Sequence, residues 1–192
     1  MSDKIRAIDH PRTGSARTII ALAALTLVAF GLRYYGSWIR FFWYDELAVH
    51  VYALNGHPSS QEPPLFSWLE FFWIWLTQSD TPATMRLLPV ALGALAVPVT
   101  YRFARHFGSR NCAMLAALLV AVAPKALHLS HEIRPYSLFI LMSAMLLGAL
   151  FSAYEKDTWP YWLVYRVCLM LCLLTHMLAL QLCLAMGLTA VL

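Results

Sequence analysis

Apolar runs long enough to cross a membrane follow one another along most of this 192-residue chain, and they leave few folds open to it. Hydrophobic residues make up 60% of the sequence and charged residues only 12%, whereas about 25% of a soluble domain is charged. A soluble protein of this size could not cover its surface with so few charges. The low counts of Gly, Pro and Cys exclude collagen-like, disordered and disulfide-scaffold classes. The sequence therefore predicts an integral membrane protein, all-α, folded as a polytopic helix bundle.

The positions of the apolar runs predict the membrane spans. Because one crossing needs about 20 apolar residues, the chain has room for five or six transmembrane helices. After a cytoplasmic tail over residues 1–17, we expect spans at about 18–35, 87–101, 112–127, 135–154, 161–175 and 177–192. Residues 161–192 would be too long for a single crossing as one helix, which predicts a break near His176.

Two basic clusters predict how the chain is oriented. They adjoin the first two apolar runs and consist of Lys4, Arg6, Arg12 and Arg17, then Arg102, Arg105 and Arg110. The positive-inside rule places both clusters in the cytoplasm. Residues 36–86 and the polar segment around Glu132 then lie outside. We expect the clusters to act as topology determinants rather than as a nucleic-acid surface, and Arg33 to snorkel at the outer interface.

The first outer loop, residues 36–86, contains an aromatic segment after Pro63 and Pro64. As a helix over residues 65–78 it would be about 21 Å long, too short for a hydrocarbon core of about 30 Å. Its polar side chains fall on or near one face, namely Ser67, Glu70, Thr77 and Gln78. We therefore expect an amphipathic helix that lies at the membrane surface.

Four charged residues outside the basic clusters gather on the predicted outer face: Asp45, Glu46, Glu132 and Arg134. Ionisable groups near a bilayer are costly and suggest a functional site. An Asp can act as a general base, an Arg suits phosphate, and a helix beginning at Pro135 would offer free N–H groups to an anion. Two plainer readings stay open: an ordinary acidic pair on a loop, and a local ion pair between Glu132 and Arg134.

Metal and redox chemistry have little support in the pattern. The histidines at positions 50, 57, 128, 131 and 176 show no metal-ligand spacing. Cys168 and Cys172 lie four residues apart in an apolar run, where we expect them to pack as small hydrophobic side chains.

Five segments, in order, resemble the GT-C membrane glycosyltransferases of glycosyltransferase family 39. They are FFWYDEL (41–47), EPPLFSWLEFFWIW (62–75), the Arg-Leu-Pro span with its Arg-rich turn (85–124), LSHEIRPYSLFIL (129–141) and LLTHMLAL (173–180). The family includes dolichyl-phosphate-mannose protein mannosyltransferases, lipid A aminoarabinose transferases and Rgt-type bacterial sugar transferases. Glu62 stands where the aminoarabinose branch carries a phosphate-binding Lys, which argues against that branch and leaves Arg134 as the better phosphate candidate.

The resemblance implies a transferase that moves a sugar from a polyprenyl-phosphate donor to a glycan, lipid or protein acceptor on the extracytoplasmic face of a bacterial inner membrane. It implies Asp45 and Glu46 as catalytic residues, with Asp45 as base or acceptor-positioning group. It implies that Arg134 lies near the donor phosphate and that the substrate is also bound by Glu132, Tyr136, His131, Pro63 and Pro64. No metal ligand is predicted, although some relatives use a divalent cation (Mg²⁺ or Mn²⁺), which two nearby carboxylates could share.

Relatives carry more spans than this chain, which raises a second hypothesis. The chain would then be a non-catalytic lipid-phosphate-binding or scaffold subunit that needs a partner chain to complete the fold. A small transporter is a third hypothesis, suggested by prolines within the spans. It is disfavoured because no internal repeat is present and because no string of charged residues runs through the spans; Arg166 is the lone case, and we expect it nearer the cytoplasmic end.

Overall fold

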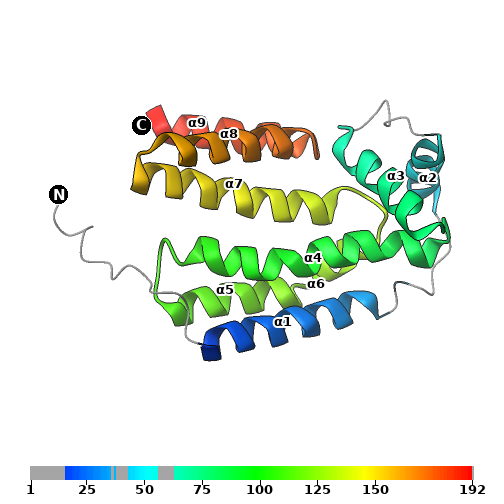
Figure 1. Ribbon diagram of the computed structural model, residues 1–192, viewed down its shortest axis with the longest axis horizontal. Coiled ribbons are helices and arrows are strands. Elements are labelled where there is room, and N and C mark those ends of the chain that lie inside the picture. Colours follow the sequence, from blue (N-terminus) through cyan, green and yellow to red (C-terminus); the bar gives the residue numbers. More distant parts are fainter. Residues whose placement is uncertain (1–15, 36, 38–42, 56–62, 192) are drawn as a thin grey trace.

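The computed structural model describes residues 16–35, 37, 43–55 and 63–191, with side chains up to residue 186. Within these ranges the chain forms helices and no strand (Figure 1). The helices are α1 (Ala16–Tyr34), α2 (Tyr44–Leu54), α3 (Leu65–Thr77), α4 (Pro82–Ala104), α5 (Arg110–Val122), α6 (Pro124–Ser130), α7 (Tyr136–Lys156), α8 (Trp159–Leu173) and α9 (Leu178–Val191). The predicted all-α bundle is confirmed.

Helix α4 lies at the centre of the bundle, between α7 on one side and α1 and α5 on the other (Figure 1). Helix α8 packs on the far side of α7. The short helices α2 and α3 lie together at one end, close to the start of α4 and the start of α7 (Figure 1). That end also receives the α6–α7 connection and the α8–α9 break, so it collects side chains from distant parts of the sequence.

Three helices are long and apolar enough to cross a membrane, namely α1, α4 and α7. A fourth crossing is possible if α5 and α6, which meet at a bend of 52°, count as one broken span. Helix α8 has 15 residues and α9 has 14, shorter than the 18 residues of a candidate span. The structure thus shows a polytopic membrane protein with three to four candidate spans, while crossings by α8 and α9 stay a prediction.

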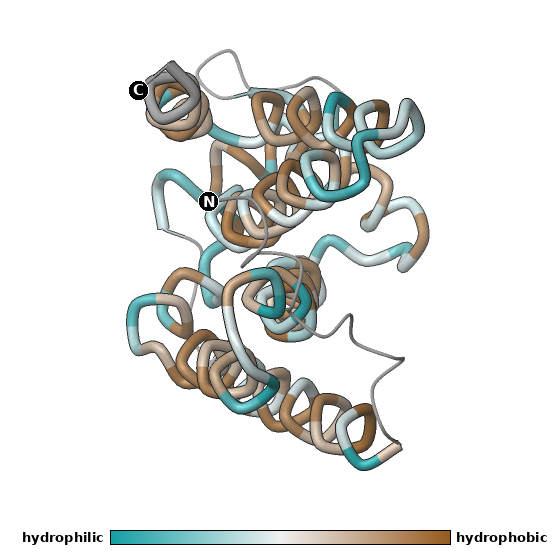
Figure 2. Tube along the Cα trace, turned by 90° about the vertical axis from the view of Figure 1, so that its left-hand side faces the viewer, coloured by the Kyte–Doolittle hydropathy of each residue, from teal (hydrophilic) through white to brown (hydrophobic). Residues whose placement is uncertain are grey.

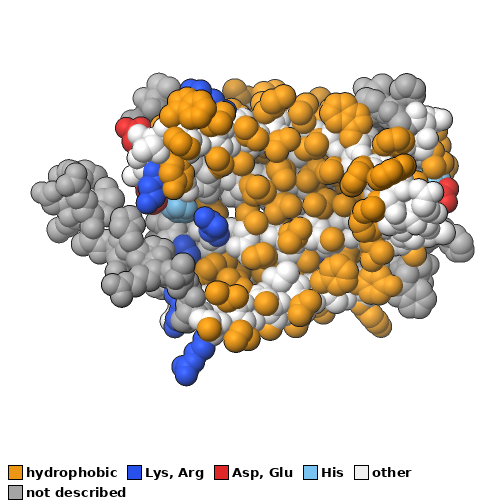
Figure 3. Space-filling view, viewed as in Figure 1, with side chains coloured by type: hydrophobic (Ala, Val, Ile, Leu, Met, Phe, Trp, Pro, Cys, Tyr) orange, Lys and Arg blue, Asp and Glu red, His pale blue; other side chains and the backbone are white. Residues whose placement is uncertain are grey.

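The surface of the bundle agrees with a membrane environment. Hydrophobic side chains cover most of the face in Figure 3, whereas Lys and Arg gather at the end that holds the α4–α5 turn. In Figure 2 the hydrophobic colour likewise runs along the helices and the hydrophilic colour concentrates in the connections. Because lipid rather than water faces such helices, exposed apolar side chains are expected along their lengths.

Local sequence signals explain where the helices begin and break. Helix α4 starts after Thr81, whose hydroxyl accepts a hydrogen bond from the Thr84 N–H, and α5 starts after Ser109 in the same way. Such caps satisfy amide groups that have no partner within the helix. Helix α5 stops before Pro124, which begins α6. Proline is suited to a helix start but cannot continue the preceding hydrogen-bond ladder.

The prediction that Arg33 snorkels at the outer interface is wrong. Its side chain is only 1% exposed and lies inside the bundle. The guanidinium donates hydrogen bonds to the carbonyl oxygens of Val120 (2.9 Å) and Ala121 (2.9 Å), at the end of α5, and of Ala29 (3.2 Å) in its own helix. The bend after α5 leaves carbonyl groups without helical partners, and a buried cation satisfies them at lower cost than leaving them unpaired.

Helix α3 has nearly the predicted bounds, but two side chains of its polar face are turned inward. Ser67 and Glu70 are buried, while Trp68, Phe72 and Trp75 are about half exposed or more. The indole N–H of Trp73 donates to the Thr84 carbonyl (2.8 Å), which ties α3 to α4. The helix therefore presents aromatic side chains outward and its carboxyl group inward, the reverse of an amphipathic helix between lipid and water.

Candidate active site

Asp45 and Glu46 lie in the first turn of α2, not on a loop as one of the plainer readings had it. Carboxylates are favoured at this position because the helix N-terminus carries a partial positive charge. The two neighbours point into different surroundings: the side chain of Glu46 is 1% exposed, whereas that of Asp45 is 42% exposed. Their chemical roles must therefore differ.

Glu46 forms a buried ion pair with Arg86 of α4. Its Oε2 receives a hydrogen bond from Arg86 Nη2 at 2.6 Å, and its Oε1 one from Arg86 Nε at 3.3 Å. The backbone N–H of Ile133 also donates to Oε1, at 2.9 Å. A two-pronged guanidinium–carboxylate contact of this kind fixes distance and orientation together. One carboxylate thus fastens α2 to α4 and to the α6–α7 connection.

Asp45 faces Arg134, which follows Ile133 in that connection. Oδ2 of Asp45 lies 3.7 Å from Nη1 of Arg134. The Arg134 side chain is 16% exposed, and its Cζ lies 5.7 Å from the centre of the Tyr136 ring. This is within the range of a cation–π contact. The half-exposed Asp45 carboxylate and the largely buried Arg134 guanidinium therefore lie close together. Their neighbours in the chain, Glu46 and Ile133, are joined by a hydrogen bond that fixes the two segments relative to each other.

Glu132 does not pair with Arg134, so the reading of a local ion pair between them is wrong. Its Oε1 lies 3.4 Å from Nε2 of His128, four residues earlier. The structure brings Glu132 to the same connection as Arg134, but its carboxylate lies against the His128 ring of α6. His131 ends α6 and its side chain is partly buried.

Pro63 and Pro64 are partly buried and precede α3. The N–H of Leu65, the first residue of α3, donates to the carbonyl of Leu174 at 3.0 Å. This bond ties the start of α3 to the break between α8 and α9. The two prolines therefore lie where α3 approaches that break. Within the described residues, the hydrogen bond that places this segment runs to the break and not to Asp45 or Arg134.

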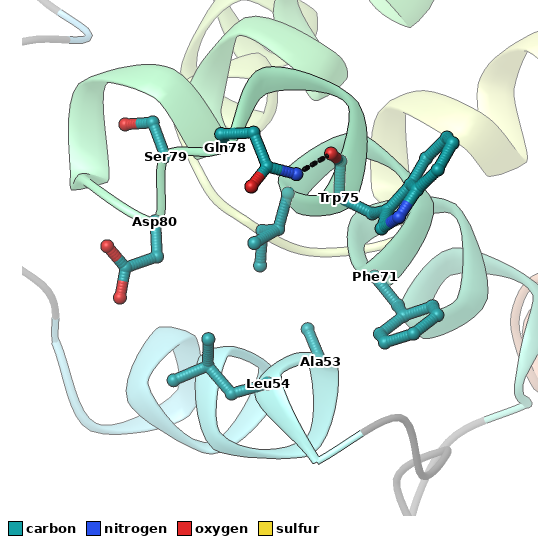
Figure 4. Close-up of a pocket in the computed structure, with 8 residues that line it drawn as sticks. Ala53, Leu54, Phe71, Trp75, Gln78, Ser79 and Asp80 are labelled. Atoms are coloured by element: carbon teal, nitrogen blue, oxygen red, sulfur yellow. Dashed lines mark hydrogen bonds between the residues drawn. The ribbon is translucent and has the colours of Figure 1, made fainter.

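A cavity of about 330 Å³ lies elsewhere, between the end of α2 and the end of α3 (Figure 4). Apolar and aromatic side chains form most of its walls, among them Leu54, Phe71 and Trp75, and the polar residues Gln78, Ser79 and Asp80 lie at one side. None of the predicted site residues lines it. We place the candidate active site at Asp45 and Arg134, where the charges converge, rather than at this cavity.

A shared divalent cation does not fit the acidic pair as it lies here. Both oxygens of Glu46 already accept hydrogen bonds from Arg86, and Asp45 faces a cation. Across the described ranges, no group of three or more His, Cys, Asp and Glu side chains could hold a metal ion. Dependence on Mg²⁺ or Mn²⁺ stays a prediction, and no step below passes through a metal.

Sequence reasoning missed two ionisable residues at this end of the bundle. The sequence points to Arg86 only through the Arg-Leu-Pro resemblance, yet this residue neutralises Glu46. An Arg at the start of an apolar run is itself a signal that an acid lies nearby. Glu70 was assigned to a surface helix, yet it is 0% exposed. Burial raises its pKa well above the usual value, because removing a carboxylate from water disfavours the charged form.

Comparison with known proteins places the chain in a family. The sequence model of the family described as dolichyl-phosphate-mannose-protein mannosyltransferase matches residues 61–192. This range includes Arg86, Glu132 and Arg134, whereas Asp45 and Glu46 precede it. No curated protein and no solved structure matches the chain.

Proposed function

The chain belongs to the dolichyl-phosphate-mannose-protein mannosyltransferase family of membrane glycosyltransferases, and we propose that it moves a sugar from a polyprenyl-phosphate donor to a hydroxyl acceptor on the extracytoplasmic face. The observation that carries this proposal is the contact between Asp45 and Arg134. A candidate base and a candidate phosphate ligand lie within 4 Å at the end of a membrane bundle, although they come from distant parts of the sequence.

The proposed reaction exchanges one bond at the anomeric carbon of the sugar. The acceptor oxygen forms a bond to that carbon as the bond to the donor phosphate oxygen breaks. Asp45 accepts the proton of the acceptor hydroxyl, and Arg134 stabilises the negative charge that stays on the polyprenyl phosphate. A donor phosphate bound at Arg134 competes with Asp45 for the guanidinium, which releases the carboxylate to face the acceptor.

The remaining predicted residues supply support around this pair. Glu46 holds α2 in place through Arg86 and the Ile133 amide, so its role is to position Asp45 and Arg134 rather than to touch the reacting atoms. Tyr136 lies against the Arg134 guanidinium. Glu132, His131, Pro63 and Pro64 remain proposed substrate contacts, supported by their place at the same end of the bundle.

The test measures sugar transfer by the full chain in lipid nanodiscs, supplied with polyprenyl-phosphate sugars and a panel of acceptors. We expect Asp45→Asn to lower kcat at least about 100-fold, the usual contribution of a positioned base. Arg134→Gln should raise the KM for the donor. Asp80→Asn is the matched control, because that carboxylate is also partly exposed and lines the cavity between α2 and α3, which Arg134 does not line. Transfer that survives Asp45→Asn would refute the assigned base.

The same ion pair suits a second function, a subunit that binds a lipid phosphate without turnover. Arg134 supplies the phosphate contact in either case, but Asp45 then needs no acceptor. Binding of polyprenyl phosphate without transfer, followed by transfer once a partner chain is added, would support this function. In that case Asp45→Asn should keep or strengthen phosphate binding, because the phosphate no longer competes with a carboxylate for the Arg134 guanidinium.

A further inference from the structure

The break between α8 and α9 brings a histidine, His176, against the residues of the proposed site. The break is held in place from two sides. The Leu65 N–H donates to the Leu174 carbonyl at 3.0 Å, and the buried Thr175 hydroxyl donates to the Cys172 carbonyl at 2.6 Å. His176 follows directly, so its backbone position is fixed relative to α3 and α8.

The His176 ring lies beside the first turn of α7. The centres of the His176 and Tyr136 rings are 5.4 Å apart, and those of His176 and Phe139 are 5.8 Å apart. Arg134 Cζ lies 5.7 Å from the centre of the same Tyr136 ring. Tyr136 therefore contacts both the guanidinium proposed to bind phosphate and the imidazole at the break.

A second contact of His176 concerns the backbone of α9. Its Nδ1 accepts a hydrogen bond from the Leu178 N–H at 3.1 Å. Leu178 is the first residue of α9, where an amide has no partner within the helix. In the neutral ring this bond assigns the hydrogen to Nε2. The side chain thus does two separable things: it caps α9 and it packs on Tyr136.

We infer that His176 is a positioning residue for the proposed transferase, because its ring holds the Tyr136 ring in the orientation that supports Arg134. The inference rests on the proposed function, since it concerns how the donor phosphate is bound. It assigns the histidine of the Tyr-Thr-His-like segment to the donor side of the site, through Tyr136 rather than by direct contact with substrate. Aromatic and cation–π contacts of this kind shift binding by small factors rather than abolishing it.

Two substitutions separate the ring contact from the cap. His176→Asn keeps a side-chain acceptor suited to a helix N-terminus but removes the ring. His176→Phe keeps a ring against Tyr136 and Phe139 but removes the acceptor for Leu178. Radiolabelled polyprenyl phosphate is titrated onto each full-length protein in nanodiscs, and the thermal midpoint of unfolding is recorded for each.

If the ring positions Arg134, His176→Asn weakens binding of polyprenyl phosphate about fivefold, as expected for a contact of this type, and leaves the acceptor KM unchanged. His176→Phe then binds within about twofold of the parent, although it unfolds at a lower temperature. Combining His176→Asn with Tyr136→Leu adds little to the loss from Tyr136→Leu alone, because both act through one ring.

Equal binding by His176→Asn and the parent protein would overturn the inference, and so would a loss in His176→Phe without one in His176→Asn. These results differ from a failure of the proposed function. If the parent protein transfers sugar and requires Asp45 while His176→Asn binds normally, only the role of His176 falls. If the parent protein binds no polyprenyl phosphate, the proposed function and this inference fall together.

Discussion

Glu70 lies in an environment that its position in the sequence does not suggest, because the sequence predicts it on a helix at the membrane surface. It is fully buried, and neither carboxyl oxygen has a hydrogen-bond partner among the residues that the structure describes. Burial raises its pKa well above the usual value, so the folded protein holds a proton that the unfolded chain releases. Stability is then highest below the unfolded pKa and falls as the pH rises towards the folded pKa.

We predict that Glu70→Gln stabilises the protein at neutral and alkaline pH, because an amide cannot ionise and so removes the proton release that favours the unfolded chain. The thermal midpoint should rise by about 2–4 °C, the shift expected for roughly 1 kcal/mol in a chain of this size. Thermal unfolding in detergent from pH 4 to pH 9 measures it. Glu155→Gln, at an exposed carboxylate, is the control. A stability difference that does not grow with pH would contradict the protonated form of Glu70.

The Glu46–Arg86 pair makes a different prediction at the same scale, because here both charges are buried and paired. Arg86→Met leaves Glu46 without its cation and should cost about 3–5 kcal/mol. The double variant Arg86→Met/Glu46→Leu removes both charges and should recover part of that loss. Thermal unfolding of the parent, the two single variants Arg86→Met and Glu46→Leu, and the double variant gives the coupling between the residues. Additive losses would show that the two side chains act independently.

Among the helices, α3 shows what the sequence can and cannot predict. Its bounds followed from the Pro63–Pro64 pair and the length of the aromatic run, because these are local signals. Its buried face did not, because whether Glu70 meets water or protein depends on how α3 packs in the fold, including its contacts with α2 and α4. In the same way, the positions of Asp45 and Arg134 on one membrane face were predicted, but their contact depends on how α2 docks against the α6–α7 connection.

The junction of α1, α4 and α6 depends on a glycine. A Cβ added at Gly93 of α4 would lie 2.5 Å from the Ser130 hydroxyl oxygen and 2.9 Å from Arg33 Nε. Something must shift to relieve contacts this close. Gly93 therefore lets Arg33 pass α4 to reach the carbonyl groups at the end of α5.

We predict that Gly93→Ala destabilises the protein by about 1–3 kcal/mol, the usual cost of overpacking. Gly31→Ala is the matched control, because a Cβ at Gly31 meets nothing within 4 Å; in α1 it should be neutral or slightly stabilising, since alanine favours helix. Thermal unfolding of the two variants measures the difference. Equal midpoints would mean that Arg33 and Ser130 move aside at no cost.

For the whole molecule, the arrangement of the helices separates two ends. One end holds Asp45, Arg134, the α6–α7 connection and the α8–α9 break (Figure 1). The other holds the α4–α5 turn, where Lys and Arg gather (Figure 3). The charge pattern of the sequence predicted this separation, because basic residues near spans favour the cytoplasm. The fold agrees with it, since residues predicted on one side of the membrane lie at one end of the bundle.

The orientation of these ends in the membrane follows as the final prediction. Asn55 is exposed at the end of α2, on the active-site end, and Cys112 is exposed at the start of α5, at the other end. With Asn55→Cys in intact cells or spheroplasts, a membrane-impermeant maleimide should label position 55 at once. Cys112 should react only after the membrane is opened, because the charge pattern predicts that the α4–α5 turn faces the cytoplasm. Cys112→Ser in the same background assigns each signal to its residue. Labelling of Cys112 before permeabilisation, with position 55 protected, would invert the topology and place the Asp45–Arg134 site in the cytoplasm.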